Sequence, residues 1–322
     1  MTGRRDVIKA GLAIAGMQSM GALAAQQKTA PKEEEPKKPL PPLATKTIPS
    51  TGERLAVIGV GTNNYSPVTA DERAARREVL AGLTAAGASV IDTAPAYRQS
   101  EEVIGELLAD IGNRNQAFIA TKVTADGDQL ERGVAMIDES LRRLKTNVLD
   151  LVQIHSLNGV GVLFPHLFER KKKGQIRYVG ITTSSSGQHD RMVELINSQA
   201  LDFIQVDYSL ANRAAADKVL PAALNKRVAV LVNLPFGGRR DGNLFSRVGN
   251  AGLPDWVDEI GVGSWGQFFL KYVVSHPAVT VAIPGMTKPS HLEDNLAAAR
   301  GRMPDASMRA RMEKYWDQNF GG

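Results

Sequence analysis

Cysteine is absent from the 322-residue chain. Its absence excludes disulfide bonds, thiolate metal sites and cysteine nucleophiles, and we expect no metal centre. A complete G-x-G-x-x-G pattern is also missing after every expected strand, since IGVGTNNYS at 58–66 has the first two glycines and lacks the third. This second absence disfavours a doubly wound dinucleotide-binding sheet, which is the main alternative to the fold predicted below.

A large net charge is missing from most of the chain. The whole sequence carries +5 at neutral pH, and residues 1–48 account for +4, with 8 of the 39 Lys and Arg and 4 of the 34 Asp and Glu. The remaining residues are therefore nearly neutral. A body of this kind has no electrostatic footprint for DNA or RNA, which excludes nucleic acid as a partner.

The excess positive charge begins in a segment that resembles a twin-arginine (Tat) signal. The segment GRRDVIKAG contains Arg4 and Arg5, and an apolar stretch from Gly11 to Leu23 follows that is too short to span a membrane. Small residues at 22–24 offer a cleavage site. We expect residues 1–26 to engage the Tat translocon and the protein to be periplasmic or otherwise exported. A basic, alanine-rich tail is the alternative.

Residues 27–48 differ in composition from the rest of the chain, with five prolines and blocks of mixed charge. Such a segment cannot bury enough apolar surface to fold, so we predict a disordered linker. Residues 49–322 then form a single domain.

Short apolar runs alternate with helical patterns from Arg54 onward. The runs are continuous, as buried parallel strands require. Eight strand-and-helix units in this length predict an α/β fold of the (β/α)8 TIM barrel type. The expected strands lie near residues 55–60, 89–93, 117–123, 148–155, 177–182, 203–208, 228–234 and 279–284.

Four polar residues fall at or just beyond the ends of expected strands, namely Asp92, Tyr97, Lys122 and His155. Catalytic groups of such barrels lie at these strand ends. A buried carboxylate and a buried lysine are costly to desolvate unless they pair, so we predict an Asp92–Lys122 ion pair beside Tyr97. The lysine would lower the tyrosine pKa from about 10 and make Tyr97 a general acid, with His155 orienting a substrate oxygen.

The chain resembles the aldo-keto reductase family at these four positions. The matching segments span about residues 50–300 in the family's order: IGVGTNN, VIDTAPAYRQSEEVIGELL, IATKV, LDLVQIHS, IRYVGIT, FIQVDYS and VAIPGMTKPSHLEDNL. The resemblance implies a catalytic Asp, Tyr, Lys and His tetrad, a nicotinamide cofactor and reduction of a carbonyl substrate. NADP(H) is then the preferred cofactor and NAD(H) the alternative, and a monomer is the family's commonest state.

The resemblance also assigns a cofactor site. Gln205 would hold the nicotinamide carboxamide, Lys288 and His291 would approach the 2′-phosphate, and Asn295 the adenine. An N-capped surface helix is the alternative for the segment after residue 284. The remaining cofactor contacts would come from Gly61, Thr62, Thr182, Thr183, Asn233, Phe236, Gly237, Pro284 and Gly285.

The chain departs from the family at two cofactor positions. Thr182 and Thr183 stand where many members have Ser-Asn, and Asn233 stands where many have an aromatic residue that stacks on the nicotinamide. Arg239 and Arg240 are candidates for pyrophosphate contacts, with a solvated charged loop as the alternative.

Substrate contacts are assigned to Asn64, Tyr65, Trp256 and the residues after His155, although Tyr65 and Trp256 could equally be packing residues. Three functions stay open. The first is an exported carbonyl reductase, which would need a redox partner to re-reduce its cofactor. The second is a nicotinamide-binding sensor or regulatory module, and the third is an aldolase with Lys122 as a Schiff-base lysine.

Overall fold

A closed parallel sheet forms the centre of the protein. The computed structural model describes residues 40–125, 127, 129–238 and 242–321. Bridges Ile58–Ala282 and Gly61–Gly285 join the first and last strands, so the predicted (β/α)8 barrel is confirmed. In chain order the strands are β3 (Val60–Gly61), β4 (Val90–Asp92), β5 (Phe118–Val123), β6 (Leu149–Ile154), β7 (Ile176–Thr183), β8 (Phe203–Asp207), β9 (Ala229–Asn233) and β10 (Val281–Ala282).

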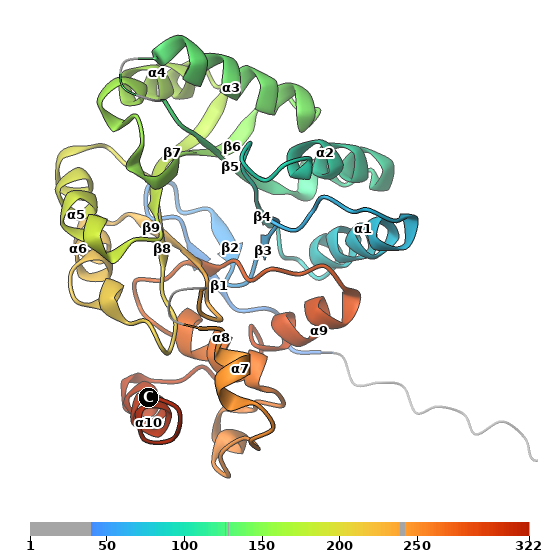
Figure 1. Ribbon diagram of the computed structural model, residues 1–322, viewed down its shortest axis with the longest axis vertical. Helices are drawn as coiled ribbons and strands as arrows, with labels where there is room; N and C mark the ends of the chain where they lie inside the picture. The colour runs from blue at the N-terminus through green and yellow to red at the C-terminus, as the bar shows by residue number, and fades with distance from the viewer. Residues whose placement is uncertain (1–39, 126, 128, 239–241, 322) are drawn as a thin grey trace, which may run out of the picture. The chain divides into compact units, whose positions relative to one another are not determined.

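Helices surround this sheet (Figure 1). A short helix, α7 (Leu244–Val248), lies in the connection between β9 and α8, and α10 (Ala306–Asn319) follows the last barrel helix. Within the described residues, no helix has the length and apolarity needed to cross a membrane. The helices that follow the strands are α1 (Ala70–Ala85), α2 (Ser100–Ile111), α3 (Leu130–Arg143), α4 (Val160–Lys172), α5 (His189–Ser198), α6 (Val219–Lys226), α8 (Trp265–Val274) and α9 (Pro289–Ala297).

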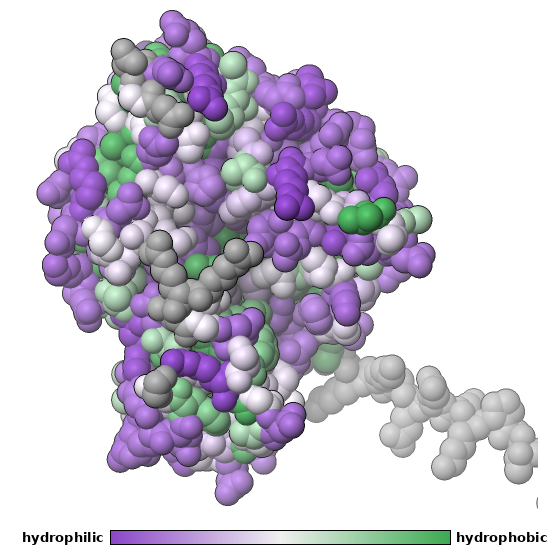
Figure 2. Space-filling model, viewed as in Figure 1, coloured by the Kyte–Doolittle hydropathy of each residue, from purple (hydrophilic) through white to green (hydrophobic). Residues whose placement is uncertain are grey.

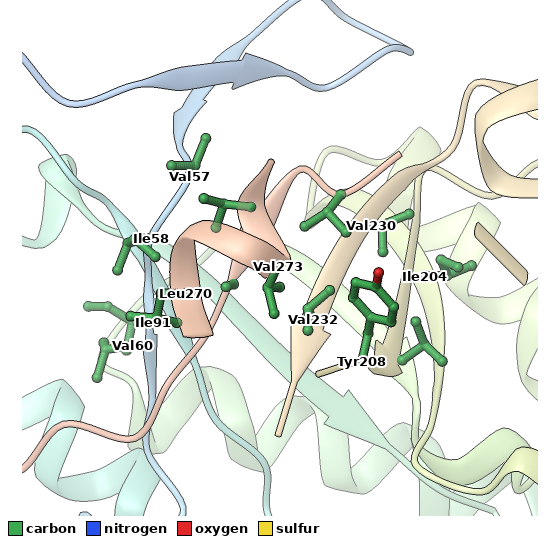
Figure 3. Packing of buried hydrophobic residues seen from close by; sticks show 14 of the residues in the cluster. Val57, Ile58, Val60, Ile91, Ile204, Tyr208, Val230, Val232, Leu270 and Val273 are labelled. Atoms are coloured by element: carbon green, nitrogen blue, oxygen red, sulfur yellow. The ribbon is translucent and has the colours of Figure 1, made fainter. Parts of the chain in front are cut away.

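Two hydrophobic clusters divide the strand side chains between them. Successive residues of a strand point to opposite faces, so Val90 belongs to the cluster inside the barrel and Ile91 to the cluster beneath the helices. Figure 3 shows part of the outer cluster, where Val273 of α8 packs among side chains of the strands. The barrel interior is therefore filled, and only its ends are available for a site.

A hairpin that the sequence does not predict covers the N-terminal end of the barrel. Strands β1 (Thr45–Thr47) and β2 (Arg54–Ala56) pair antiparallel. Ile48 and Leu55 join the interior cluster, and the Tyr178 hydroxyl at the start of β7 donates to Glu53 over 2.6 Å. The predicted single strand at 55–60 is therefore divided in two: Leu55 and Ala56 pair with β1 in the hairpin, whereas Ile58 and Val60–Gly61 join the barrel sheet.

The domain boundary also lies earlier than predicted. Residues 45–48 belong to the hairpin and Ile48 is fully buried, so the linker cannot extend to residue 48. The predicted signal, 1–26, and most of the predicted linker lie outside the described residues. Figure 2 shows a predominantly hydrophilic face on which apolar residues form separate small patches.

Candidate active site

A layer of polar side chains lies above the apolar interior of the barrel. Asp92, Lys122, Gln153 and Gln205 each come two residues after a member of the interior cluster and are 3% exposed or less. The period of two along a strand therefore turns all four inward. Because their strands are neighbours or near neighbours in the sheet, the side chains meet at the C-terminal end of the barrel.

The predicted ion pair is present in this layer. Lys122 Nζ lies 2.7 Å from Asp92 Oδ2 and also donates to the carbonyl oxygen of Thr93 over 2.8 Å. Gln205 Nε2 donates to the other carboxylate oxygen over 2.8 Å. Burial alone would lower the pKa of Lys122, but the Asp92 and Tyr97 charges outweigh it and raise that pKa. Lys122 is therefore an ammonium that is already paired, which disfavours a Schiff-base lysine.

Tyr97 lies next to this pair in the turn between β4 and α2. Its ring centroid is 5.0 Å from Lys122 Nζ, and the ring meets that of His155 edge-on with 6.3 Å between centroids. The turn is held by two backbone bonds, Tyr97 N–H to Ala94 O over 3.0 Å and Ser100 N–H to Tyr97 O over 3.1 Å. The structure thus brings together all four predicted catalytic residues.

The protonation states differ in part from those predicted. Burial raises the pKa of Tyr97, and the opposing charge of Lys122 does not overcome it, so the predicted lowering below the usual value is wrong. Burial and the Lys122 charge lower the pKa of His155 to about 4. At neutral pH the phenol therefore keeps its proton and His155 is a neutral imidazole that can donate one N–H.

A cavity of about 350 Å³ opens beside Tyr97 and Asp92 and is called the larger cavity here. It brings together six of the predicted cofactor residues: Gly61, Thr62, Asn233, Phe236, Gly237 and Gly285. Sequence reasoning missed the other lining residues, which follow strand ends without a recognisable pattern: Asn63, Ser184, Leu234, Pro235, Asn243 and Ile283. Two bigger hollows, of about 640 and 610 Å³, lie at the opposite end of the barrel.

Two glycines are required by the shape of this cavity. A Cβ on Gly61 would lie 2.7 Å from the Ile283 carbonyl oxygen, where β3 and β10 close the barrel. Gly237 has φ of +80°, and a Cβ there would meet the Gly242 carbonyl oxygen at 2.5 Å. Any other residue at either position would displace backbone that lines the cavity.

Besides Gln153 Oε1 in the polar layer, two buried amide oxygens at this end of the barrel have no donor among the described residues. They are Gln205 Oε1, whose amide nitrogen holds Asp92, and Asn233 Oδ1, whose amide nitrogen donates to Ser184 Oγ over 3.2 Å. A buried acceptor without a partner is costly. These two oxygens suit a ligand that donates N–H groups, such as a primary amide.

Two of the three predicted threonine contacts, Thr182 and Thr183, do not line the cavity. Thr182 and Thr183 are 2% and 1% exposed, and the Thr183 hydroxyl donates to Gln188 Oε1 and accepts from the Ser185 N–H. Thr183 therefore holds its own loop, and Ser184 presents the hydroxyl at the cavity. Thr62 does line the cavity, but its hydroxyl donates to the Asp92 carbonyl oxygen.

The residues predicted to bind the distant part of a cofactor are divided. Lys288 at the N-cap of α9 and His291 in its first turn are exposed, so both can meet a ligand. Asn295 is only 4% exposed, on the buried face of α9, which argues against an adenine contact. The carbonyl of Pro284 accepts from the Gly61 N–H and closes the barrel. Arg239 and Arg240 lie outside the described residues.

Two of the three predicted substrate residues, Tyr65 and Trp256, pack against other side chains and line neither the larger cavity nor the second cavity described below. Tyr65 is fully buried, with the Arg76 guanidinium 5.9 Å from its ring centroid. Trp256 packs between Phe268 and Tyr315, at 5.8 and 5.9 Å between ring centroids. Asn64 is exposed but does not line the cavity, where Asn63 takes its place.

A second cavity, of about 190 Å³, is called the smaller cavity here and is lined by Lys122 and His155. Because Tyr97 lines the larger cavity and its ring contacts His155, the two cavities adjoin at this pair. The other walls are residues that the sequence did not mark: Pro95, Ala96, Val123, Thr124 and Met136.

Known proteins that are similar to this chain in sequence or in fold are reductases. The chain is 31% identical to Aldo-keto reductase YhdN of Bacillus subtilis (strain 168) over 205 aligned residues. The alignment covers 58% of this chain and 60% of that relative. It is 27% identical over 266 residues to Methylglyoxal reductase YeaE of Escherichia coli (strain K12), covering 79% and 89%. An aldo/keto reductase from Klebsiella pneumoniae, solved in complex with NADP and acetate, has a TM-score of 0.65 at 24% identity and covers 84% of this chain and 93% of its own.

The model of the Aldo/keto reductase family matches residues 57–316, which include the ion pair, Tyr97, His155 and both cavities. This enzyme is therefore a member of the aldo/keto reductase family.

Proposed function

We propose that this enzyme is an NADP(H)-dependent oxidoreductase that reduces an aldehyde or a ketone to an alcohol. The observation that carries the proposal is the buried Asp92–Lys122 pair beside a protonated Tyr97 and a neutral His155. The similarity to a methylglyoxal reductase supports a small carbonyl substrate, and the structural similarity to an NADP complex supports the cofactor.

Each residue of the tetrad has one role in the proposed reaction. When bound, the nicotinamide supplies the hydride that adds to the carbonyl carbon. Tyr97 gives its phenolic proton to the carbonyl oxygen, and the Lys122 ammonium stabilises the phenolate that results. His155 donates an N–H to the same oxygen and orients it. Asp92 keeps Lys122 charged and in place.

The larger cavity is the proposed seat of the nicotinamide. Gln205 Oε1 and Asn233 Oδ1 are buried acceptors that fit the two N–H bonds of its carboxamide. Exposed Lys288 and His291, at the start of α9, suit the 2′-phosphate that distinguishes NADP(H) from NAD(H). Proximity of the cavity to Tyr97 would bring the hydride donor and the proton donor to one carbonyl group.

The test is a fluorescence titration with NADPH and NADH, followed by addition of a reactive aldehyde in the same cuvette. Tyr97→Phe should reduce the rate of NADPH oxidation at least about 100-fold while NADPH affinity stays within a few-fold. A normal rate in this variant would remove Tyr97 as the acid. Tight binding by the wild type without any oxidation would favour a sensor or regulatory module instead.

We also propose that the enzyme is exported through the Tat pathway. The support is the sequence of residues 1–26, with its arginine pair and short apolar stretch. Because this pathway carries folded proteins, the reductase would fold and could take up its cofactor before translocation. Continued turnover would then require a partner that re-reduces the bound cofactor.

A further inference from the structure

The smaller cavity has a different character from the larger one. Apart from Lys122 and His155, its walls are formed by a proline, an alanine, a valine, a methionine and one threonine. Lys122 is already paired with Asp92, so it offers no free charge to a ligand. A cavity with such walls favours an uncharged, largely apolar group.

Its size limits that group to a short chain. A volume of about 190 Å³ equals about six water molecules at their liquid volume of about 30 Å³ each. About six non-hydrogen atoms can therefore enter, counted from the carbonyl that Tyr97 and His155 would hold. A longer or branched substituent would have to displace a wall or extend out of the cavity, which is partly open.

Met136 is the wall residue that α3 contributes. It lies on α3, one turn after Gly133. A Cβ added to Gly133 would lie 2.7 Å from the side chain of Leu163 in α4. Gly133 lets α3 lie close to Leu163, and Met136 is the side chain by which α3 lines the cavity, so the free volume depends on the residue at position 136. Methionine is unbranched and flexible, and its removal leaves space without exposing a polar group.

We propose that the smaller cavity holds the carbon chain of the substrate and that Met136 sets its maximum length. The substrate class is an uncharged aliphatic aldehyde of about three to five carbons, reduced to the primary alcohol. This inference depends on the proposed function. In the reaction, the cofactor hydride adds to the aldehyde carbon, the Tyr97 proton goes to oxygen, and the chain keeps its position against Met136.

The experiment is a kcat/KM series over straight-chain aldehydes from two to eight carbons with NADPH. The wild type should show a maximum at three to five carbons and a decline beyond. Met136→Ala removes three non-hydrogen atoms, so the maximum should move by about two carbons, with a gain of about fourfold for each added methylene that becomes buried. The gain should appear mainly in KM. Met136→Phe should move the maximum towards shorter chains.

Met303→Ala is the matched control, because Met303 is also a partly buried methionine packed against the core but does not line either cavity. Its chain-length profile should equal that of the wild type. Unchanged profiles in both Met136 variants, or an equal change in Met303→Ala, would overturn the inference and leave carbonyl reduction standing. If the wild type binds NADPH and reduces no aldehyde, the proposed function fails and this inference with it.

Discussion

At the scale of single residues, the buried ion pair dominates the energetics of the site. Asp92 and Lys122 are 3% and 2% exposed, so each charge depends on the other for compensation. Removing one partner of a buried pair leaves an unpaired charge, whereas replacing both by apolar residues of similar size is far less costly.

We therefore predict that Asp92→Leu lowers the free energy of unfolding by about 3–5 kcal/mol and that adding Lys122→Met restores much of it. The measurement is chemical denaturation. Arg191→Ala serves as control, since its pair with Glu194 is exposed and should contribute under about 0.5 kcal/mol. A loss below 1 kcal/mol in the Asp92 variant would contradict a desolvated pair. Neither the single nor the double variant should reduce carbonyls.

The lowered pKa of His155 leads us to predict that the stability of the folded protein depends on pH. The pKa of His155 is lowered from 6.5 to about 4 in the folded protein. Between these values the unfolded chain binds more protons than the folded one, so stability is present above pH 6.5 and is lost as pH falls towards 4.

His155→Gln should therefore show a smaller loss of Tm between pH 6.5 and 4 than the wild type. His276 gives an internal comparison, because burial and the charges of Arg309 and Lys46 lower its pKa to about 4 as well. His155→Gln and His276→Gln should each reduce the loss of Tm at acid pH, and the double variant should reduce it further. Identical pH profiles for the wild type and His155→Gln would contradict the lowered pKa.

At the scale of elements, the N-terminal end of α9 leads to a prediction about the preference for NADPH over NADH. Lys288 occupies its N-cap with an extended backbone and an exposed side chain, and the following Pro289 is favourable in the first helical turn. Its substitution should remove a charge without disturbing the helix.

Lys288→Ala should weaken NADPH about tenfold and NADH less than twofold, as measured by fluorescence titration. The difference should shrink at high salt because the contact is electrostatic. Lys226→Ala is the control, with an exposed lysine in the last turn of α6, at the opposite end of the barrel. Equal weakening of both cofactors would refute the 2′-phosphate contact.

Strands and helices with a recognisable hydrophobic pattern could be predicted from the sequence. A strand that forms only because it pairs with another segment could not. Strands β4 to β9 lie within a residue or two of their predicted bounds, because a continuous apolar run has to be buried on both faces. Strand β1 has only the sequence TKT and follows a proline-rich segment. It exists because Thr45 faces Ala56 across a hairpin, a contact that no local periodicity indicates.

At the scale of the whole molecule, the proposed export makes a prediction about Arg4 and Arg5. Replacing both with lysine preserves the charge but removes the arginine pair. The variant should accumulate inside the cell, folded and able to bind NADPH, as measured by fractionation and titration. Unimpaired export of this variant would overturn the Tat assignment, and loss of NADPH binding would point to a folding defect instead.

The sequence by itself determined the barrel and the four residues at its mouth, because parallel strands arranged in order bring their C-terminal ends together. Only the tertiary structure decided which neighbours surround them. It places Tyr65 in the core and Ser184, rather than Thr183, at the larger cavity. It also raises the pKa of Tyr97 through burial and brings Met136 to the smaller cavity. These features depend on contacts between distant segments, and burial and cavity shape arise only when the segments pack.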